Sequence, residues 1–141
     1  MYPDMILFLL QAMRPHQWVK NLFIFAALVF DRKMLVPQYL QRTLAGFVLF
    51  SLLAGAVYLV NDLADIEHDR HHPRKQHRPL PAGHLSPRIA TVTAIIIPLI
   101  VLPASLQLDS WFGLLITVYW LQNIAYSFWL KHVVIIDVLL I

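Results

Sequence analysis

The fold of this chain is decided by TLAGFVLFSLLAGAVYLV, residues 43–60, which contains 18 consecutive residues without a charge. The hydrocarbon core of a bilayer is about 30 Å thick and needs about 20 residues of helix, so this stretch is long enough to cross it. Small side chains recur along it and permit neighbouring helices to approach closely; they are Ala45, Gly46, Ser51, Ala54, Gly55 and Ala56. The stretch therefore predicts a membrane helix packed against other helices.

The composition of the whole chain agrees with that prediction. Of 141 residues, 59% are apolar and 13% are charged, against about half and about a quarter in an ordinary soluble domain. Three more stretches predict spans, namely residues 18–36, 89–108 and 110–130, and Asp109 is expected to cap the last of them. We therefore expect an all-α integral membrane helix bundle with four complete spans. The absence of cysteine excludes disulfides, thiolate metal sites and cysteine nucleophiles.

A further apolar run, residues 133–141, is too short to cross a bilayer. We interpret it as the first part of a fifth span, with Asp137 as a buried polar group that faces the bundle. On this interpretation residues 1–141 are the N-terminal part of a single membrane domain whose later helices are missing.

The positive charges are distributed unequally between the two ends of the predicted spans. If successive spans alternate in direction, eight of the 11 Lys and Arg residues lie on the side of residues 61–88 and three lie on the other side. Arg14 belongs to the first group and is interpreted as an interfacial anchor. Because loops rich in Lys and Arg stay in the cytoplasm, we expect a multi-pass protein of the inner (plasma) membrane, with its N-terminus and residues 61–88 cytoplasmic.

Residues 61–88, here called the polar segment, read NDLADIEHDRHHPRKQHRPLPAGHLSPR and hold nine of the chain's 19 charged residues. Asp62, Asp65 and Asp69 are spaced i, i+3 and i+7, which places them at about 0°, 300° and 340° around a continuous helix. Three carboxylates on one helix face repel one another and call for a compensating cation. The spacing therefore indicates a cation site at the end of the span, with Asn61 beside it.

Mg²⁺ prefers oxygen ligands and commonly joins carboxylates to substrate phosphates. The three aspartates are thus candidate metal-binding and catalytic residues for a diphosphate substrate. Counter-charge for its phosphates would come from Arg74, Lys75 and Arg78. Two alternatives stay open: a solvated helix end whose acids pair with Arg70, Arg74 and Lys75, and a zinc site made by His68, His71 and His72.

The run Asn61-Asp62-x-x-Asp65-x-x-x-Asp69 resembles the first aspartate-rich motif of the UbiA-type polyprenyltransferase superfamily, integral membrane enzymes that handle diphosphates through Mg²⁺. RPLPAG at residues 78–83 is similar to the loop after that motif, and YSFWLK at residues 126–131 to the end of the fourth helix. The stretches most similar to the branch that acts on decaprenyl phosphate are RPHQWVKN, residues 14–21, and YLVNDLADIEHDRHHPRKQHRPL, residues 58–80.

This resemblance implies a UbiA-type multi-helix fold and transfer of 5-phosphoribose from phosphoribosyl diphosphate to a polyprenyl (decaprenyl) phosphate, a lipid-linked precursor of cell-wall arabinan. It implies that Mg²⁺ and diphosphate are held by Asn61, Asp62, Asp65 and Asp69. Phosphate contacts are implied for Lys20, Arg78 and Lys131, and a place in the pocket for Tyr126.

Family members are longer and carry a second aspartate-rich motif, so we expect the 141-residue chain to lack part of the active site. The alternatives are an aromatic polyprenyltransferase of the 4-hydroxybenzoate type and a non-catalytic membrane fragment. The expected partners are the two substrates and the lipid bilayer, and no nucleic acid.

Overall fold

The computed structural model describes residues 2–132, and every regular element within this range is helical. The α-helices are α1 (Tyr2–Ala12), α2 (Ala26–Phe30), α3 (Pro37–Ala64), α4 (Ile66–Arg70), α5 (Pro87–Leu108) and α6 (Ser110–Phe128). The 3₁₀ helices are η1 (Pro15–Phe25), η2 (Lys75–His77) and η3 (Leu130–His132). The all-α class is confirmed. The predicted fifth span, residues 133–141 with Asp137, lies outside the described residues.

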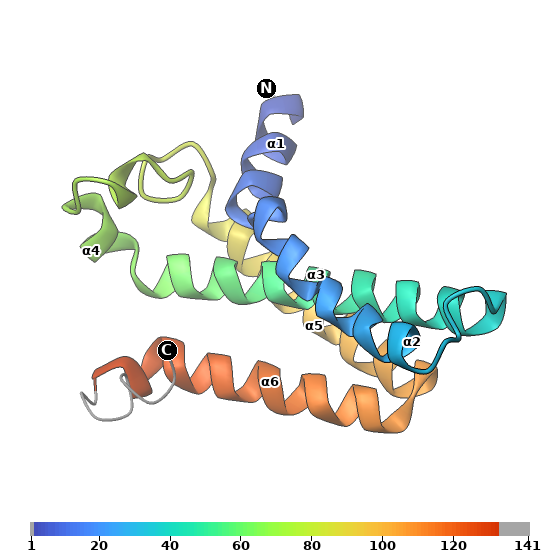
Figure 1. Ribbon diagram of the computed structural model, residues 1–141. Coiled ribbons are helices and arrows are strands. Elements are labelled where there is room, and N and C mark those ends of the chain that lie inside the picture. Colours follow the sequence, from blue (N-terminus) through green and yellow to red (C-terminus); the bar gives the residue numbers. More distant parts are fainter. Residues whose placement is uncertain (1, 133–141) are drawn as a thin grey trace.

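Three long helices form the body of the structure, α3, α5 and α6, which lie side by side (Figure 1). The segment from η1 to α2 lies along α3, and α1 projects from the bundle. One cluster of buried apolar residues joins α3 to α5 and includes Leu80 and Leu85 from the polar segment, each at most 1% exposed. Burial of these two leucines anchors the polar segment to the end of the bundle, where it holds the candidate site in place.

Two helices are long and apolar enough to cross a membrane, α3 with 28 residues and α5 with 22. They contain the predicted spans 43–60 and 89–108. Among the described residues no other helix meets the same test of length and composition. The stretch predicted as the first span is divided between η1 and α2. The stretch predicted as the fourth span forms α6, which has 19 residues and contains the polar pair Gln122 and Asn123. Of the four complete spans expected, the structure therefore supports two.

The ends of α5 and α6 opposite the polar segment are fixed by two polar contacts. The Asp109 side chain accepts a hydrogen bond from the backbone N–H of Phe112 at 2.9 Å, so the predicted cap of α6 is confirmed. The Arg42 guanidinium of α3 donates a hydrogen bond to the carbonyl of Leu108, at the C-terminus of α5. This contact satisfies a carbonyl that has no partner within its own helix.

Gly113 of α6 packs directly against the backbone of α5 at Leu106. A Cβ atom there would lie 2.6 Å from both the backbone nitrogen and the Cα of Leu106. Because backbone atoms cannot rotate away, we expect Gly113→Ala to destabilise the fold by about 1–3 kcal/mol, measured as a lower thermal unfolding temperature in detergent. Gly46→Ala is the matched control, since its Cβ would meet the Phe112 ring at an ordinary 3.5 Å. Equal unfolding temperatures for the two variants would contradict this packing.

Candidate functional site

The acidic cluster is shaped by a break between α3 and α4 at Asp65. Its backbone, with φ −104° and ψ 7°, is not α-helical, so α3 ends at Ala64 and α4 begins at Ile66. The prediction of three aspartates on one face assumed a continuous helix. The structure keeps Asp62 and Asp69 together and directs Asp65 to a different partner.

Asp62 and Asp69 are buried, at 1% and 0% exposure, and share one guanidinium group. Nη1 of Arg78 donates hydrogen bonds to Oδ1 of Asp62 and to Oδ2 of Asp69, both at 3.1 Å. Asp62 Oδ1 also accepts a 2.7 Å hydrogen bond from Nη2 of Arg14, and Nζ of Lys75 lies 3.5 Å from Asp69 Oδ1. Buried carboxylates need partners of this kind, because isolation from water penalises an unpaired charge. Burial therefore excludes solvated carboxylates at these two positions, whereas the pairing of Asp69 with Lys75 agrees with the solvated-helix alternative.

Asp65 forms an ion pair with Lys131 of η3. The two residues are 66 positions apart in the chain, and both are largely shielded from solvent, at 23% and 17% side-chain exposure. The pair brings the end of α6 to the acidic end of α3. Lys131 therefore lies beside the aspartate-rich run, as the alternation of spans predicted.

The other predicted site residues are Lys20, Asn61 and Tyr126. Lys20 is exposed on η1, and within the described range no ion pair joins it to the three aspartates. Asn61 is half-buried next to Asp62, and Tyr126 is half-buried on α6 before Lys131. The structure thus brings together Asp62, Asp69 and Arg78, and separately Asp65 and Lys131.

Arg14 is the site residue that the sequence analysis missed. It was interpreted as an interfacial anchor, but its guanidinium binds Asp62 and also lies 4.6 Å from the centroid of the Tyr58 ring. Arg14 has a left-handed backbone, with φ 54°, at the junction of α1 and η1. The signal in the sequence was its place at the start of RPHQWVKN, which carried the family resemblance.

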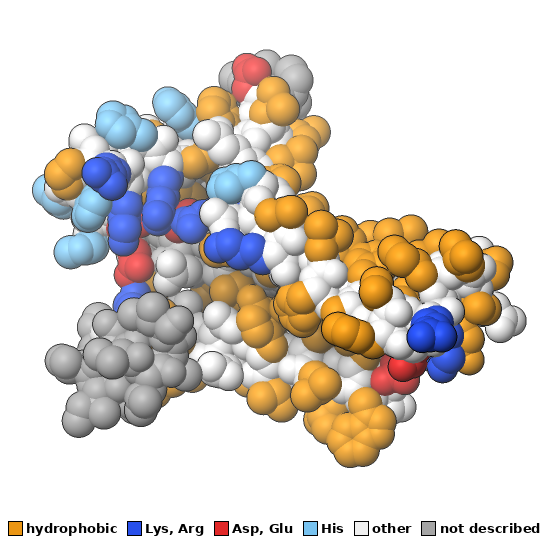
Figure 2. All heavy atoms as spheres, viewed as in Figure 1, with side chains coloured by type: hydrophobic (Ala, Val, Ile, Leu, Met, Phe, Trp, Pro, Cys, Tyr) orange, Lys and Arg blue, Asp and Glu red, His pale blue; other side chains and the backbone are white. Residues whose placement is uncertain are grey.

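A cavity of about 350 Å³, here called the polar pocket, opens beside Asp62. Its basic lining consists of Arg14, Arg74, Arg78, His16 and His77. Among the described residues that line it, Asp62 is the only acidic one. Figure 2 shows Lys, Arg and His side chains gathered at this end of the molecule, with acidic side chains among them. The pocket therefore has the chemistry of an anion site.

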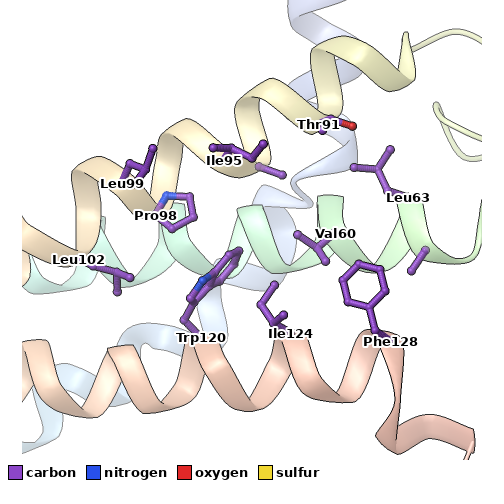
Figure 3. Close-up of a pocket in the computed structure, with 12 residues that line it drawn as sticks. Val60, Leu63, Thr91, Ile95, Pro98, Leu99, Leu102, Trp120, Ile124 and Phe128 are labelled. Atoms are coloured by element: carbon purple, nitrogen blue, oxygen red, sulfur yellow. The ribbon is translucent and has the colours of Figure 1, made fainter.

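A second cavity, here called the apolar cavity, lies between α3, α5 and α6 and has a volume of about 530 Å³ (Figure 3). Its walls are almost entirely apolar, and Trp120, Ile124 and Phe128 point into it from α6. The lining residues Val60 and Ala64 lie two positions from Asp62, which is about 160° around the helix. The polar pocket and the apolar cavity therefore lie on opposite faces of α3.

The aspartates have the donor chemistry that Mg²⁺ prefers. Asp69 Oδ1 is fully buried and accepts no hydrogen bond from the described residues, which leaves an oxygen suited to a ligand. Arg78 occupies the space between Asp62 and Asp69, and no group of three acidic, His or Cys side chains is clustered closely enough for a metal in the part of the chain described. The donor chemistry of Asp62 and Asp69 suits Mg²⁺, but in this structure the Arg78 guanidinium holds the two carboxylates that would bind the metal.

The alternative zinc site is not assembled among the described residues. Nδ1 of His71 lies 2.9 Å from the carbonyl oxygen of Glu67, and Nδ1 of His72 accepts hydrogen bonds from the backbone N–H groups of Arg74 and Lys75. These ring nitrogens stabilise the local turn and do not converge on one point.

Comparison with known proteins adds an independent finding. A sequence profile described as the UbiA prenyltransferase family matches residues 12–141. The chain is 37% identical over 132 residues to the decaprenyl-phosphate phosphoribosyltransferase of Mycobacterium tuberculosis, covering 91% of this chain and 44% of that protein. The proteins of the same name from Mycolicibacterium smegmatis and Corynebacterium glutamicum are 34% and 35% identical, covering 94% of this chain and 43% and 41% of their own lengths. The chain thus spans less than half the length of these curated relatives.

Proposed function

The chain belongs to the UbiA prenyltransferase family, and from that membership and the geometry of the site we propose that it supplies the diphosphate-binding part of a membrane phosphoribosyltransferase. The resemblance noted in the sequence is confirmed at the level of the family. The proposed reaction transfers 5-phosphoribose from phosphoribosyl diphosphate to a polyprenyl (decaprenyl) phosphate. The observation that carries the proposal is the cluster of Arg78 with the buried Asp62 and Asp69, of which Asp62 and Arg78 line the polar pocket.

The proposed setting is the inner membrane, with the N-terminus and the polar segment in the cytoplasm and four spans in the bilayer. The distribution of charge supports this arrangement. Arg14 and Lys131 contact aspartates at the end of α3 that leads into the polar segment, whereas Arg42 contacts the far end of α5. The more basic end of the bundle is the one expected to stay in the cytoplasm.

Asp62, Asp65 and Asp69 are proposed to hold Mg²⁺, with Asn61 beside them. When bound, the metal would stabilise the negative charge that develops on the departing diphosphate. Arg78 and Lys75, which contact the carboxylates in this structure, would turn towards diphosphate oxygens, since a guanidinium binds phosphate in a bidentate manner. Lys20 as a further phosphate contact and Tyr126 as a pocket residue rest on the family resemblance alone.

The lipid acceptor is proposed to lie in the apolar cavity. Phe128 and Ala64 line it next to Lys131 and Asp65, so a lipid phosphate at the polar end of the cavity would meet the Lys131 ammonium group. There a phosphate oxygen of the acceptor would attack the anomeric carbon of the ribose while the bond to diphosphate breaks. The protein's part is to position the two substrates and stabilise charge, and no protein nucleophile is needed.

The test is a transfer assay in membranes that contain the full gene product, with radiolabelled phosphoribosyl diphosphate and polyprenyl phosphate. We expect labelled lipid to form with Mg²⁺ and to fall by about 100-fold or more when EDTA removes it, because the metal stabilises the leaving group. Product from a prenyl diphosphate and 4-hydroxybenzoate, with none from phosphoribosyl diphosphate, would establish the aromatic alternative. Absence of product from either pair would support a non-catalytic membrane fragment.

A further inference from the structure

We propose that the polar pocket binds a phosphomonoester group of the water-soluble substrate at its Arg74 wall, next to the diphosphate held by the aspartates. This inference rests on the proposed function and deepens it, because it specifies the class of donor. A sugar diphosphate with a second, remote phosphate would fill both positions. A prenyl diphosphate has no group for the polar pocket.

The charge balance around the pocket leaves room for an anion. Asp62 and Asp69 together carry two negative charges, and the basic groups that contact them are Arg14, Arg78 and Lys75. The guanidinium of Arg74, which also lines the pocket, has no ion pair with any described residue. Four cations against two carboxylates leave an excess of two positive charges. A phosphate monoester carries about −1.5 to −2 charges at pH 7 and would neutralise this excess.

The side chain of Arg74 lines the polar pocket but forms no hydrogen bond or ion pair with the described residues. Arg14 and Arg78 neutralise buried aspartates, so their presence is accounted for by the fold. Arg74 is exposed, and its only hydrogen bond among those in the described part of the chain is made by its backbone N–H to His72. His16 and His77 lie in the same wall and can donate further hydrogen bonds to phosphate oxygens. These groups are available to a ligand.

The position of the pocket favours a soluble substrate over a lipid headgroup. The polar pocket and the apolar cavity lie on opposite faces of α3, and the polar end of the apolar cavity lies at the Asp65–Lys131 pair. A lipid whose chain fills the apolar cavity would therefore place its phosphate at Lys131 and not at Arg74. At about 350 Å³ the polar pocket is near the small end of ligand sites, a size that suits a phosphate with a few attached carbon atoms.

Binding of ribose 5-phosphate tests this inference directly, because this probe has the remote phosphate and no diphosphate. Radiolabelled ribose 5-phosphate is added to the protein in lipid nanodiscs with EDTA present, and bound label is measured at equilibrium. We expect saturable binding that Arg74→Gln weakens by about tenfold, since a charge-assisted contact to phosphate is lost. Arg70→Gln is the matched control: it removes the same charge from the same segment, but Arg70 pairs with exposed Glu67 at 2.5 Å and lies outside the pocket.

Further measurements show whether the bound phosphate belongs to a soluble substrate or to a lipid headgroup. Arg74→Lys keeps the charge and is expected to bind ribose 5-phosphate better than Arg74→Gln does. Unfolding temperatures equal to that of the unaltered protein would show that both variants are folded. Polyprenyl phosphate in the nanodisc should not displace ribose 5-phosphate, and displacement would overturn the inference in favour of a lipid headgroup. Equal binding by Arg74→Gln and Arg70→Gln, or no binding by the unaltered protein, would also overturn it.

Inorganic diphosphate with Mg²⁺ distinguishes failure of this inference from failure of the proposed function. Arg74→Gln should keep most of its binding of this probe, because the aspartates and the two cations that contact Asp69, Lys75 and Arg78, are intact, whereas no ion pair joins Arg74 to the aspartates in the described part of the chain. An equal loss of diphosphate and ribose 5-phosphate binding would make the two positions one site and overturn the inference. The proposed function is judged separately, by the transfer assay.

Discussion

Asp69→Asn is expected to reduce phosphoribosyl transfer in membranes by about 100-fold or more while the protein stays folded. The asparagine has nearly the same shape, but it removes the negative charge that draws a divalent cation to the end of α3. Asp69 is the most buried of the three acids, and its Oδ1 accepts no hydrogen bond from the described residues. The measurement is the rate of labelled lipid formation across a range of Mg²⁺ concentrations, and we expect the half-saturating concentration to rise as well.

Glu67→Gln is the matched control for this experiment. Glu67 lies two positions before Asp69, but its carboxylate is exposed and pairs with Arg70 alone among the described residues. Its loss changes the net charge of the polar segment by the same amount, so we expect transfer within about twofold of the unaltered protein, because exposed pairs contribute little. If Asp69→Asn and Glu67→Gln have the same rates, the assignment of the metal site to Asp62, Asp65 and Asp69 is wrong.

Hydropathy and spacing predicted the parts of this molecule that depend on local sequence. The uncharged run 43–60 predicted the centre of α3, and Asp109 predicted the start of α6. The 3₁₀ geometry of η1 was not predictable in this way, because an apolar stretch is compatible with both an α-helix and a 3₁₀ helix. Its position depends on tertiary contacts, among them a buried hydrogen bond from the Asn21 amide to the Ser51 hydroxyl at 3.1 Å.

The candidate site was predictable in its residue types but not in its pairing. Periodicity grouped the three aspartates, yet it could not show that the helix breaks at Asp65 and turns that carboxylate towards Lys131. The contact of Arg14 with Asp62 joins residues 48 positions apart, so no local pattern specifies it. Long-range ion pairs follow from the fold, which is why Arg14 was interpreted as an interfacial anchor from the sequence alone.

Arg78→Met is expected to lower the free energy of unfolding by about 3 kcal/mol in the absence of divalent cations. Arg78 is the one described residue that forms ion pairs with both buried carboxylates. In the part of the chain described, the methionine leaves Asp62 with Arg14 and Asp69 with Lys75. Because the Arg78 side chain is 29% exposed, water can reach part of the vacated space, so we place the loss at the lower end for a broken buried pair. The measurement is thermal unfolding in detergent with EDTA.

Two further measurements show whether the destabilisation comes from unpaired carboxylates. Arg88→Met removes an exposed arginine at the start of α5 and is expected to change stability by less than about 0.5 kcal/mol. Mg²⁺ should raise the unfolding temperature of Arg78→Met more than that of the unaltered protein, because binding to the folded state stabilises it and the Arg78 guanidinium no longer joins the two carboxylates. An Arg78→Met protein as stable as Arg88→Met would mean that Arg78 does not hold the two carboxylates together. Equal Mg²⁺ shifts in Arg78→Met and the unaltered protein would mean that Arg78 and the metal do not compete for Asp62 and Asp69.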